Sequence, residues 1–134
     1  MDRKRKGTLN RALVGAVLLC VLLAAGLACS LWLDRHHQAL AADLEDAAWA
    51  ALSENWDTAR TLADATRQRW RGSWALVTTV ADHRPMEEIQ VLLDQLPIFL
   101  ARRDAGEFAA TCAELSARLG TLAQSHRLNL QNLF

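Results

Sequence analysis

Asp82 and His83 stand side by side in the stretch TTVADHRPMEE, between two regions of helical patterning. A carboxylate and an imidazole can bind a metal ion or move a proton near neutral pH. A metal site needs three or four ligands in a fixed shell, and these two follow no diagnostic ligand spacing. The sequence also lacks an HExxH helix, a CxxC pair and a glycine-rich phosphate loop. We therefore predict a helix corner here, with no catalytic residue, no metal and no cofactor.

The first element that must position this pair is an apolar segment at residues 12–33, which carries no charged side chain. As a helix it spans roughly 33 Å, enough to cross a bilayer core of roughly 30 Å. Five bases precede it within the first eleven residues, and Asp34 follows it. The positive-inside rule then predicts a cytoplasmic N-terminus. We expect a basic cytoplasmic tail at 1–11, a single-pass transmembrane helix at 12–33 and an extracytoplasmic domain at 34–134.

Two alternatives for the apolar segment stay open. Gly26-x-Ala28 can serve as the exit site of a cleaved signal peptide, and Leu27-Ala28-Cys29 can serve as a lipidation site at Cys29. Apolar residues continue past both sites to Leu33, which favours a retained helix. The topology of the downstream domain is the same in all three cases.

Small residues recur every four positions along the apolar segment, at Ala12, Ala16, Cys20, Ala24 and Ala28. Such a stripe lets two membrane helices approach closely. Because alanine is abundant in this chain, chance explains the stripe better than selection for self-association. Association with another membrane protein or with a second copy through this face is kept as the less favoured interpretation.

After residue 33 the apolar residues follow the spacing of helices, with no alternating strand pattern. The expected helices run over 34–54, over 56–81, from near Pro85 past Pro97, and from a capping box at Asp104–Glu107. Pro97 lacks a backbone donor and should kink or interrupt its helix. Short connections favour two antiparallel αα-hairpins that close into a four-helix bundle. The fold class is therefore all-α, a transmembrane helix followed by this bundle, with apolar stripes at Leu40, Leu44, Ala47, Ala48, Ala51 and Leu52; at Ala59, Leu62, Ala63, Thr66, Trp70, Trp74, Val77 and Val80; at Ile89, Leu92, Leu93, Leu96 and Leu100; and at Phe108, Cys112, Leu115, Leu119 and Leu122.

That topology brings all four histidines to the end of the bundle that adjoins the apolar segment. The candidate ligand-binding or proton-sensing corner comprises Asp82, His83, His126, His36 and His37. A structural role, in which these groups hydrogen-bond within a packed corner, is the favoured interpretation. This convergence is inferred from topology alone, so the distances between these residues in a structure would test it.

Tryptophan supplies most of the aromatic surface, since the chain has five tryptophans and no tyrosine. Trp49, Trp56, Trp70 and Trp74 are predicted to be core aromatics, because indole rings bury large areas in a small domain. An aromatic ligand cage is the less favoured alternative. Cys112, the one cysteine outside the apolar segment, is predicted to be a small core residue.

Trp56-x-x-Ala59, Trp70 within a basic helix, Asp82-His83 and the final LNLQNLF together resemble the DUF4363 family, small bacterial proteins found largely in Firmicutes. The resemblance implies a basic tail, one membrane helix and an all-helical outer domain that ends in an Asn-Ile-Phe-like tail. The chain departs from that pattern in its alanine- and arginine-rich composition, in Pro97 and in Leu133, which replaces isoleucine. The family has no established activity, so the resemblance supports architecture and location only.

Charge narrows the function classes. From residue 34 onward acids outnumber bases, so this part has no electrostatic reason to bind nucleic acid or anionic lipid. We expect a non-enzymatic protein of the cell membrane, held by the lipid bilayer, that acts as an interaction or accessory subunit of an envelope complex. The alternative is a ligand- or metal-binding sensor-like module that uses the histidine end. Eleven cytoplasmic residues are too few for a transmitter, which disfavours a sensor that acts alone.

Overall fold

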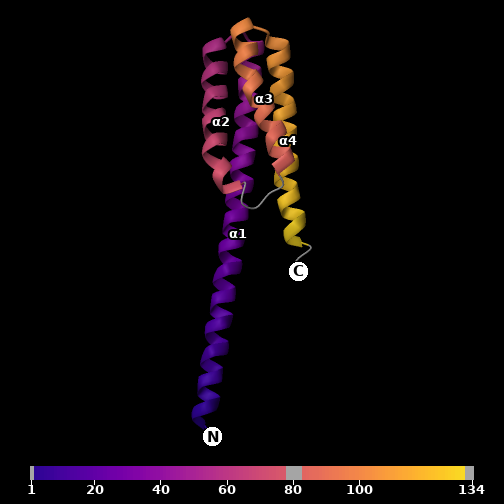
Figure 1. Cartoon of the computed structure of the whole chain (residues 1–134). Coiled ribbons are helices and arrows are strands. Elements are labelled where there is room, and N and C mark those ends of the chain that lie inside the picture. The colour runs from indigo at the N-terminus through magenta and orange to yellow at the C-terminus, as the bar shows by residue number, and fades with distance from the viewer. Residues whose placement is uncertain (1, 78–82, 132–134) are drawn as a thin grey trace. The chain divides into compact units, whose positions relative to one another are not determined.

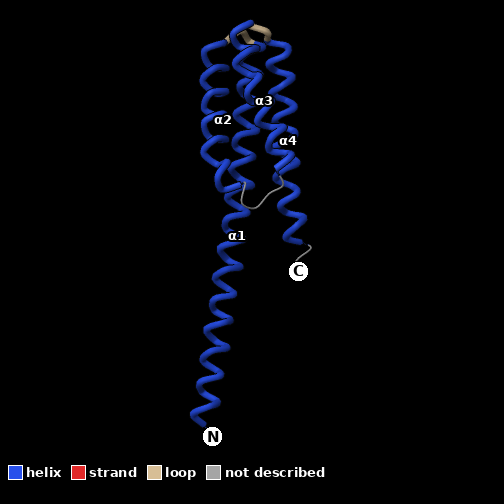
Figure 2. The backbone as a smooth tube through the Cα atoms, viewed as in Figure 1, coloured by secondary structure: helices blue, strands red, loops and turns tan. Residues whose placement is uncertain are grey.

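The computed structural model describes the backbone of residues 2–77 and 83–131 and the side chains of residues 10–74 and 84–124. Figure 2 shows that this described part is helical, with short connections and no strand. The helices are α1 (Asp2–Leu52), α2 (Trp56–Val77), α3 (His83–Arg102) and α4 (Ala105–Gln131). The all-helical prediction is confirmed. Two compact units divide the chain, an N-terminal unit at Met1–Leu33 and a C-terminal unit at Asp34–Phe134.

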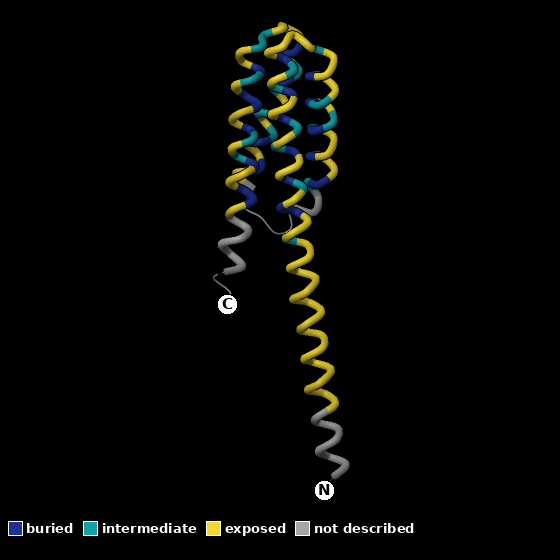
Figure 3. Tube along the Cα trace, turned by 180° about the vertical axis from the view of Figure 1, so that it is seen from behind, coloured by how far each residue is buried: buried dark blue, intermediate teal, exposed yellow. Residues whose placement is uncertain are grey.

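The N-terminal unit consists of the first part of α1. Its side chains are exposed from residue 10 to residue 29, although most of them are apolar (Figure 3). Among the described residues, α1 contains the one helix long and apolar enough to cross a membrane, judged by length and composition. The helix expected to begin at residue 34 is instead a continuation of α1, since no glycine or proline occurs from residue 27 to residue 52.

In the C-terminal unit, α2, α3, α4 and the last part of α1 lie side by side (Figure 1). Polar contacts link each of these segments to two others. One joins α1 to α2, one α2 to α3, one α3 to α4 and one α4 to α1, through the pairs Asp43–Arg69, Arg67–Asp94, Glu88–Arg118 and Glu45–Ser116. These four pairs fix the order of the helices around the unit.

Each helix of the C-terminal unit buries one stripe and exposes the other face, as Figure 3 shows by the alternation of buried and exposed turns. This is the pattern of helices that share one core. The core includes His37, Leu40, Leu44, Ala47 and Ala51 of α1; Ala59, Ala63, Thr66, Trp70 and Ser73 of α2; Met86, Ile89, Leu93, Leu96 and Leu100 of α3; and Phe108, Cys112, Leu115, Leu119 and Leu122 of α4, and Asp34, Thr111 and Ala123 are also buried. The predicted stripe of the fourth helix is confirmed throughout.

One prediction about the buried stripes is wrong, and one about Pro97 is wrong in part. Leu52, expected on the buried stripe of α1, is 52% exposed, because it lies about 100° around the helix from the core residue Ala51. Pro97, expected to kink or interrupt its helix, does not interrupt α3, and the kink stays a prediction. Proline removes one helical hydrogen bond, the one to the carbonyl of Leu93. The buried side chains of Leu93 and Leu96 keep this turn packed on the core, which offsets that loss.

The two turns that join α1 to α2 and α3 to α4 share one design. Glu54 and Arg103 adopt left-handed backbone angles, with φ of 60° and 51°. Each donates its N–H to the carbonyl three residues back, and the next residue, Asn55 or Asp104, donates to the carbonyl five residues back. The side chain of that same residue then accepts from the first turn of the following helix, at 3.4 Å from Thr58 N or 3.2 Å from Glu107 N. The capping role predicted for Asp104 is confirmed.

Glycine at the left-handed positions should stabilise the C-terminal unit. A left-handed conformation costs a residue with a Cβ atom roughly 1–2 kcal/mol, and glycine adopts it freely. We expect Glu54→Gly and Arg103→Gly each to raise the free energy of unfolding by about 0.5–1 kcal/mol in urea titrations. Glu54→Ala and Arg103→Ala are the matched controls, since alanine keeps the Cβ atom and should give no gain. A loss of stability in both glycine variants would show that the turns are formed differently.

Candidate functional site

Only part of the predicted histidine corner can be placed. Asp82 lies outside the described residues, and the side chains of His83 and His126 also lie outside them. His36 and His37 are described, on the part of α1 that belongs to the C-terminal unit. The predicted convergence of all five residues therefore stays a prediction.

His37 is fully buried in the C-terminal unit, where it lies against the aromatic core of α2. Its ring centroid is 6.2 Å from that of Trp70 and 6.2 Å from that of His36. Trp70 in turn meets the half-buried Trp74 edge-on, at 6.1 Å between ring centroids. Asp34 is buried one turn before His37. A carboxylate, two imidazoles and two indoles thus gather where α1 and α2 pack together, and we call these five residues the His37 cluster.

His36 lies at the more exposed side of the His37 cluster. Burial lowers the pKa of His36 below its ordinary value, and the positive charge of Arg69 lowers it further. A hydrogen bond to the backbone of Arg69 acts in the opposite direction and raises this pKa. The Arg69 guanidinium itself forms an ion pair with Asp43. The net effect favours the neutral imidazole.

Acid should weaken the C-terminal unit through His36. Its folded-state pKa lies below the ordinary 6.5, so the unfolded chain binds the extra proton first as the pH falls. The stability that the neutral ring contributes is complete above pH 6.5 and is lost as the pH falls toward the folded-state pKa. We expect the melting temperature of the unmodified chain, relative to that of His36→Gln, to drop between pH 7.5 and pH 5.5, an interval set by the histidine range of about 5–8. A difference that stays constant or grows on acidification would contradict this assignment.

Within the described residues, no three His, Cys, Asp or Glu side chains lie close enough to hold a metal ion. His36 and His37 therefore offer two nitrogens at most without the undescribed residues. Cys112 is fully buried on α4, as predicted, and burial raises the pKa of its thiol to about 12. This thiol stays protonated at neutral pH and is a poor nucleophile or metal ligand.

The tryptophan prediction is correct for Trp70 and wrong for Trp49. Trp70 is 1% exposed, Trp56 and Trp74 are half-buried, and Trp49 is 68% exposed. Helical geometry explains the error, since a helix turns about 100° per residue. Trp49 therefore lies about 200° around the helix from the core residue Ala47 and faces away from the core.

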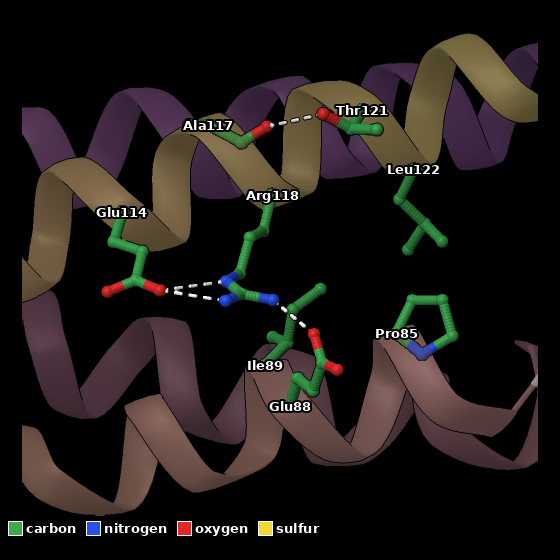
Figure 4. Close-up of a pocket in the computed structure, with 8 residues that line it drawn as sticks. All are labelled: Pro85, Glu88, Ile89, Glu114, Ala117, Arg118, Thr121 and Leu122. Carbon is green, nitrogen blue, oxygen red and sulfur yellow. Dashed lines mark hydrogen bonds and ion pairs between the residues drawn. The ribbon is translucent and has the colours of Figure 1, made fainter.

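A groove between α3 and α4 encloses about 540 Å³ and was not foreseen from the sequence (Figure 4). Its apolar lining includes Pro85, Ile89 and Leu122. Across one side, Arg118 donates to Glu114, at 2.8 and 3.0 Å, and to Glu88. The hydrogen bonds to Glu114 and Glu88, with both negative charges, raise the pKa of Arg118. Two carboxylates neutralise this cation, so the groove has little attraction for an anion.

One comparison with known proteins decides the family. The family model described as "Domain of unknown function (DUF4363)" matches residues 30–133. The chain belongs to this family. The suspected resemblance is thereby confirmed. Comparisons with curated proteins and with solved structures gave no match.

The DUF4363 match spans the His37 cluster and the groove between α3 and α4, together with the predicted corner at Asp82, His83 and His126. The small-residue stripe from Ala12 to Ala28 lies before the matched region. Its members are exposed on the N-terminal unit. The family assignment thus covers the C-terminal unit and leaves the stripe outside the matched region.

Proposed function

We propose that this DUF4363 protein is a membrane-anchored protein whose C-terminal unit serves as an interaction or accessory subunit of an envelope complex. The observation that carries the proposal is the exposed apolar surface of α1 from residue 10 to residue 29. A surface of this kind is stable against lipid and unfavourable in water. The proposed role is non-enzymatic, and its support is the exposed apolar side chains of the C-terminal unit, among them Trp49 and Ile98.

The orientation we propose puts residues 1–11 in the cytoplasm, residues 12–33 in the membrane and residues 34–134 outside. Its support is the concentration of arginine and lysine in the first eleven residues.

The finer arrangement we infer for the C-terminal unit is an antiparallel four-helix bundle made of two αα-hairpins. The two tight turns leave too few residues for neighbouring helices to run parallel. Glu88 lies 15 residues before Arg103, and its ion-pair partner Arg118 lies 15 residues after it. Equal spacing from a turn is what two antiparallel helices give.

Native membranes provide the test of the proposed role. A tag at the C-terminus should be digested by protease added outside intact cells, while a tag at the N-terminus should be protected. Chemical crosslinking of the same membranes should then shift the chain into adducts larger than its 14.9 kDa. A protected C-terminal tag would sink the orientation. Recovery of uncrosslinked monomer alone would sink the accessory role.

The second candidate function is a ligand- or metal-binding, sensor-like module at the histidine end, and the buried His37 cluster is the observation that favours it. Purified full-length chain should melt at the same temperature with and without added Zn²⁺ if this cluster is structural. A large rise in melting temperature with Zn²⁺ would favour the sensor-like module. Loss of that rise in a His37→Gln variant would assign the ion to this end of the unit.

A further inference from the structure

The C-terminal unit is built twice from the same αα-hairpin. Every core position of α1 and α2 from His37 to Ser73 has a buried equivalent 49 residues later, as in Leu40 and Ile89 or Leu44 and Leu93. The helix turns agree as well, since Glu54 and Arg103 are also 49 residues apart and make equivalent hydrogen bonds. The first hairpin thus corresponds residue by residue to the second.

The contacts between the hairpins follow the same repeat. Arg67 of α2 bonds to Asp94 of α3, at 3.5 Å. The equivalent residues 49 positions away are Ser116 of α4 and Glu45 of α1, and these bond to each other at 2.9 Å. The first contact joins the second helix of the first hairpin to the first helix of the second hairpin. The other contact joins the second helix of the second hairpin to the first helix of the first hairpin. The two hairpins are therefore related by a pseudo-two-fold axis.

This symmetry extends to the exposed surface of α1 and α3. Trp49 is 68% exposed and its equivalent Ile98 is 55% exposed. One turn before each, an exposed acid occupies equivalent positions, Glu45 and Asp94. An apolar position precedes each acid, and another follows each large apolar residue. We call these two surfaces the outer faces, and they comprise Ala42, Glu45, Trp49 and Leu52 on α1 and Val91, Asp94, Ile98 and Ala101 on α3.

Charge indicates what can cover the outer faces. Further exposed carboxylates flank them, Asp46 beside Trp49 and Glu87 one turn before Val91. Asp94 accepts a hydrogen bond from Gln90 at 3.0 Å and lies 3.5 and 3.9 Å from Arg67 and Arg71, and a carboxylate accepts up to about four hydrogen bonds, so Asp94 keeps room for a further donor. A second copy of this chain that docks through its own outer face would place acid against acid. An apolar side chain with a lysine or arginine one turn away is the complementary arrangement.

Resting on the proposed interaction role, we propose that the outer faces are two equivalent docking sites for basic amphipathic helices of a partner protein. Each site takes one helix, whose apolar side chains cover Trp49 or Ile98 and whose bases meet the neighbouring acids. Helix-on-helix recognition of this kind reads apolar anchors at three- and four-residue spacing. The pseudo-symmetry makes the chain a bivalent adaptor that engages two partner helices in the same manner.

Photo-crosslinking in native membranes tests the docking sites on the full-length chain. A photo-reactive amino acid replaces Trp49 or Ile98 on the outer faces, and Thr61 or Ala110 in two controls. Thr61 and Ala110 are exposed, lie on α2 and α4, and are also 49 residues apart, so they are matched controls. We expect positions 49 and 98 to capture the same basic amphipathic segment, identified by mass spectrometry of the crosslinked peptide. Capture at positions 61 and 110 should be at least about tenfold weaker, the factor that about 1.4 kcal/mol gives.

Charge reversal supplies the second readout. Asp46→Lys should lower capture at position 49 about tenfold and leave capture at position 98 unchanged. Equal capture with and without this substitution would overturn the charge argument.

The remaining outcomes separate the docking sites from the proposed function. Capture of a second copy of this chain, capture at only one of positions 49 and 98, or equal capture at the controls would overturn the two docking sites and leave the interaction role standing. No capture at any of the four positions would overturn both.

Discussion

Replacing Trp70 with alanine is expected to lower the free energy of unfolding of the C-terminal unit by about 3–5 kcal/mol. Trp70 is 1% exposed, and its ring lies 6.2 Å from His37 and 6.1 Å from Trp74. Truncation leaves a cavity lined by these rings, because the neighbouring helices cannot collapse into it fully. Urea unfolding followed by near-ultraviolet circular dichroism measures the loss and reports on aromatic packing at the same time.

Trp49→Ala is the matched control for this substitution. This substitution also removes an indole ring from the C-terminal unit, but Trp49 is 68% exposed and buries little area. Its effect should stay within about 0.5 kcal/mol, the range of ordinary surface substitutions. Equal losses from Trp49→Ala and Trp70→Ala would mean that the burial of the two rings is assigned wrongly.

Trp70→Phe refines the result. The indole Nε1 of Trp70 is buried and has no hydrogen-bond partner among the described residues. An unsatisfied buried N–H costs roughly 1–3 kcal/mol. Phenylalanine fills part of the ring volume without this N–H, so its loss should be smaller than the loss for alanine. A loss as large as that of Trp70→Ala would show that the N–H is satisfied.

The tryptophans also show which features of the fold can be predicted from the sequence. The three- and four-residue spacing of Leu40, Leu44, Ala47 and Ala51 is correct and fixes which side of α1 is buried. The same spacing excludes position 49 from that side. The prediction for Trp49 gave residue type more weight than position, and residue type is the weaker guide on a helix with both faces partly apolar. Helix existence and the core stripe are local properties and were therefore predictable.

The groove between α3 and α4 depends on how two helices are aligned, which no single helix determines. Glu114 and Arg118 are spaced for a pair on one helix, and that much is readable from the sequence. Glu88 is 30 residues away along the chain, and its approach to Arg118 follows from the turn at Arg103. The sequence alone did not predict this site, because its partners meet only once α3 and α4 pack together.

The sequence did not predict the internal repeat for a different reason. Equivalent positions share burial rather than residue type, as in His37 with Met86 or Trp70 with Leu119. Of the buried polar residues described, Asp34, His37, Thr66 and Ser73 lie on α1 and α2, and Thr111 lies on α4. Thr66 and Ser73 satisfy their hydroxyls within α2, by donating to the carbonyls of Leu62 and Trp70. The helix pairs α1–α2 and α3–α4 thus share a pattern of burial, while their side chains differ, and His37 belongs to the pair with more buried polar groups.

Two arginines in the apolar segment should have the largest effect on location. We expect Leu18→Arg combined with Leu22→Arg to move the chain from the membrane fraction to the soluble or aggregated fraction. Each arginine near the centre of a span costs about 2.5–3.5 kcal/mol of insertion free energy. Both leucines are exposed on the N-terminal unit, so the helical content of the C-terminal unit should not change. Leu18→Ala with Leu22→Ala is the matched control and should stay in the membrane fraction.

Cys29→Ala separates the retained helix from the alternatives at the same segment. If α1 is the anchor, this substitution leaves the chain in the membrane fraction and leaves its intact mass unchanged apart from the replaced side chain. If Cys29 carries the anchor as a lipid, the substitution changes the processed mass and releases the unit or leaves an unprocessed precursor. A cleaved signal peptide would instead remove the N-terminal unit from both proteins.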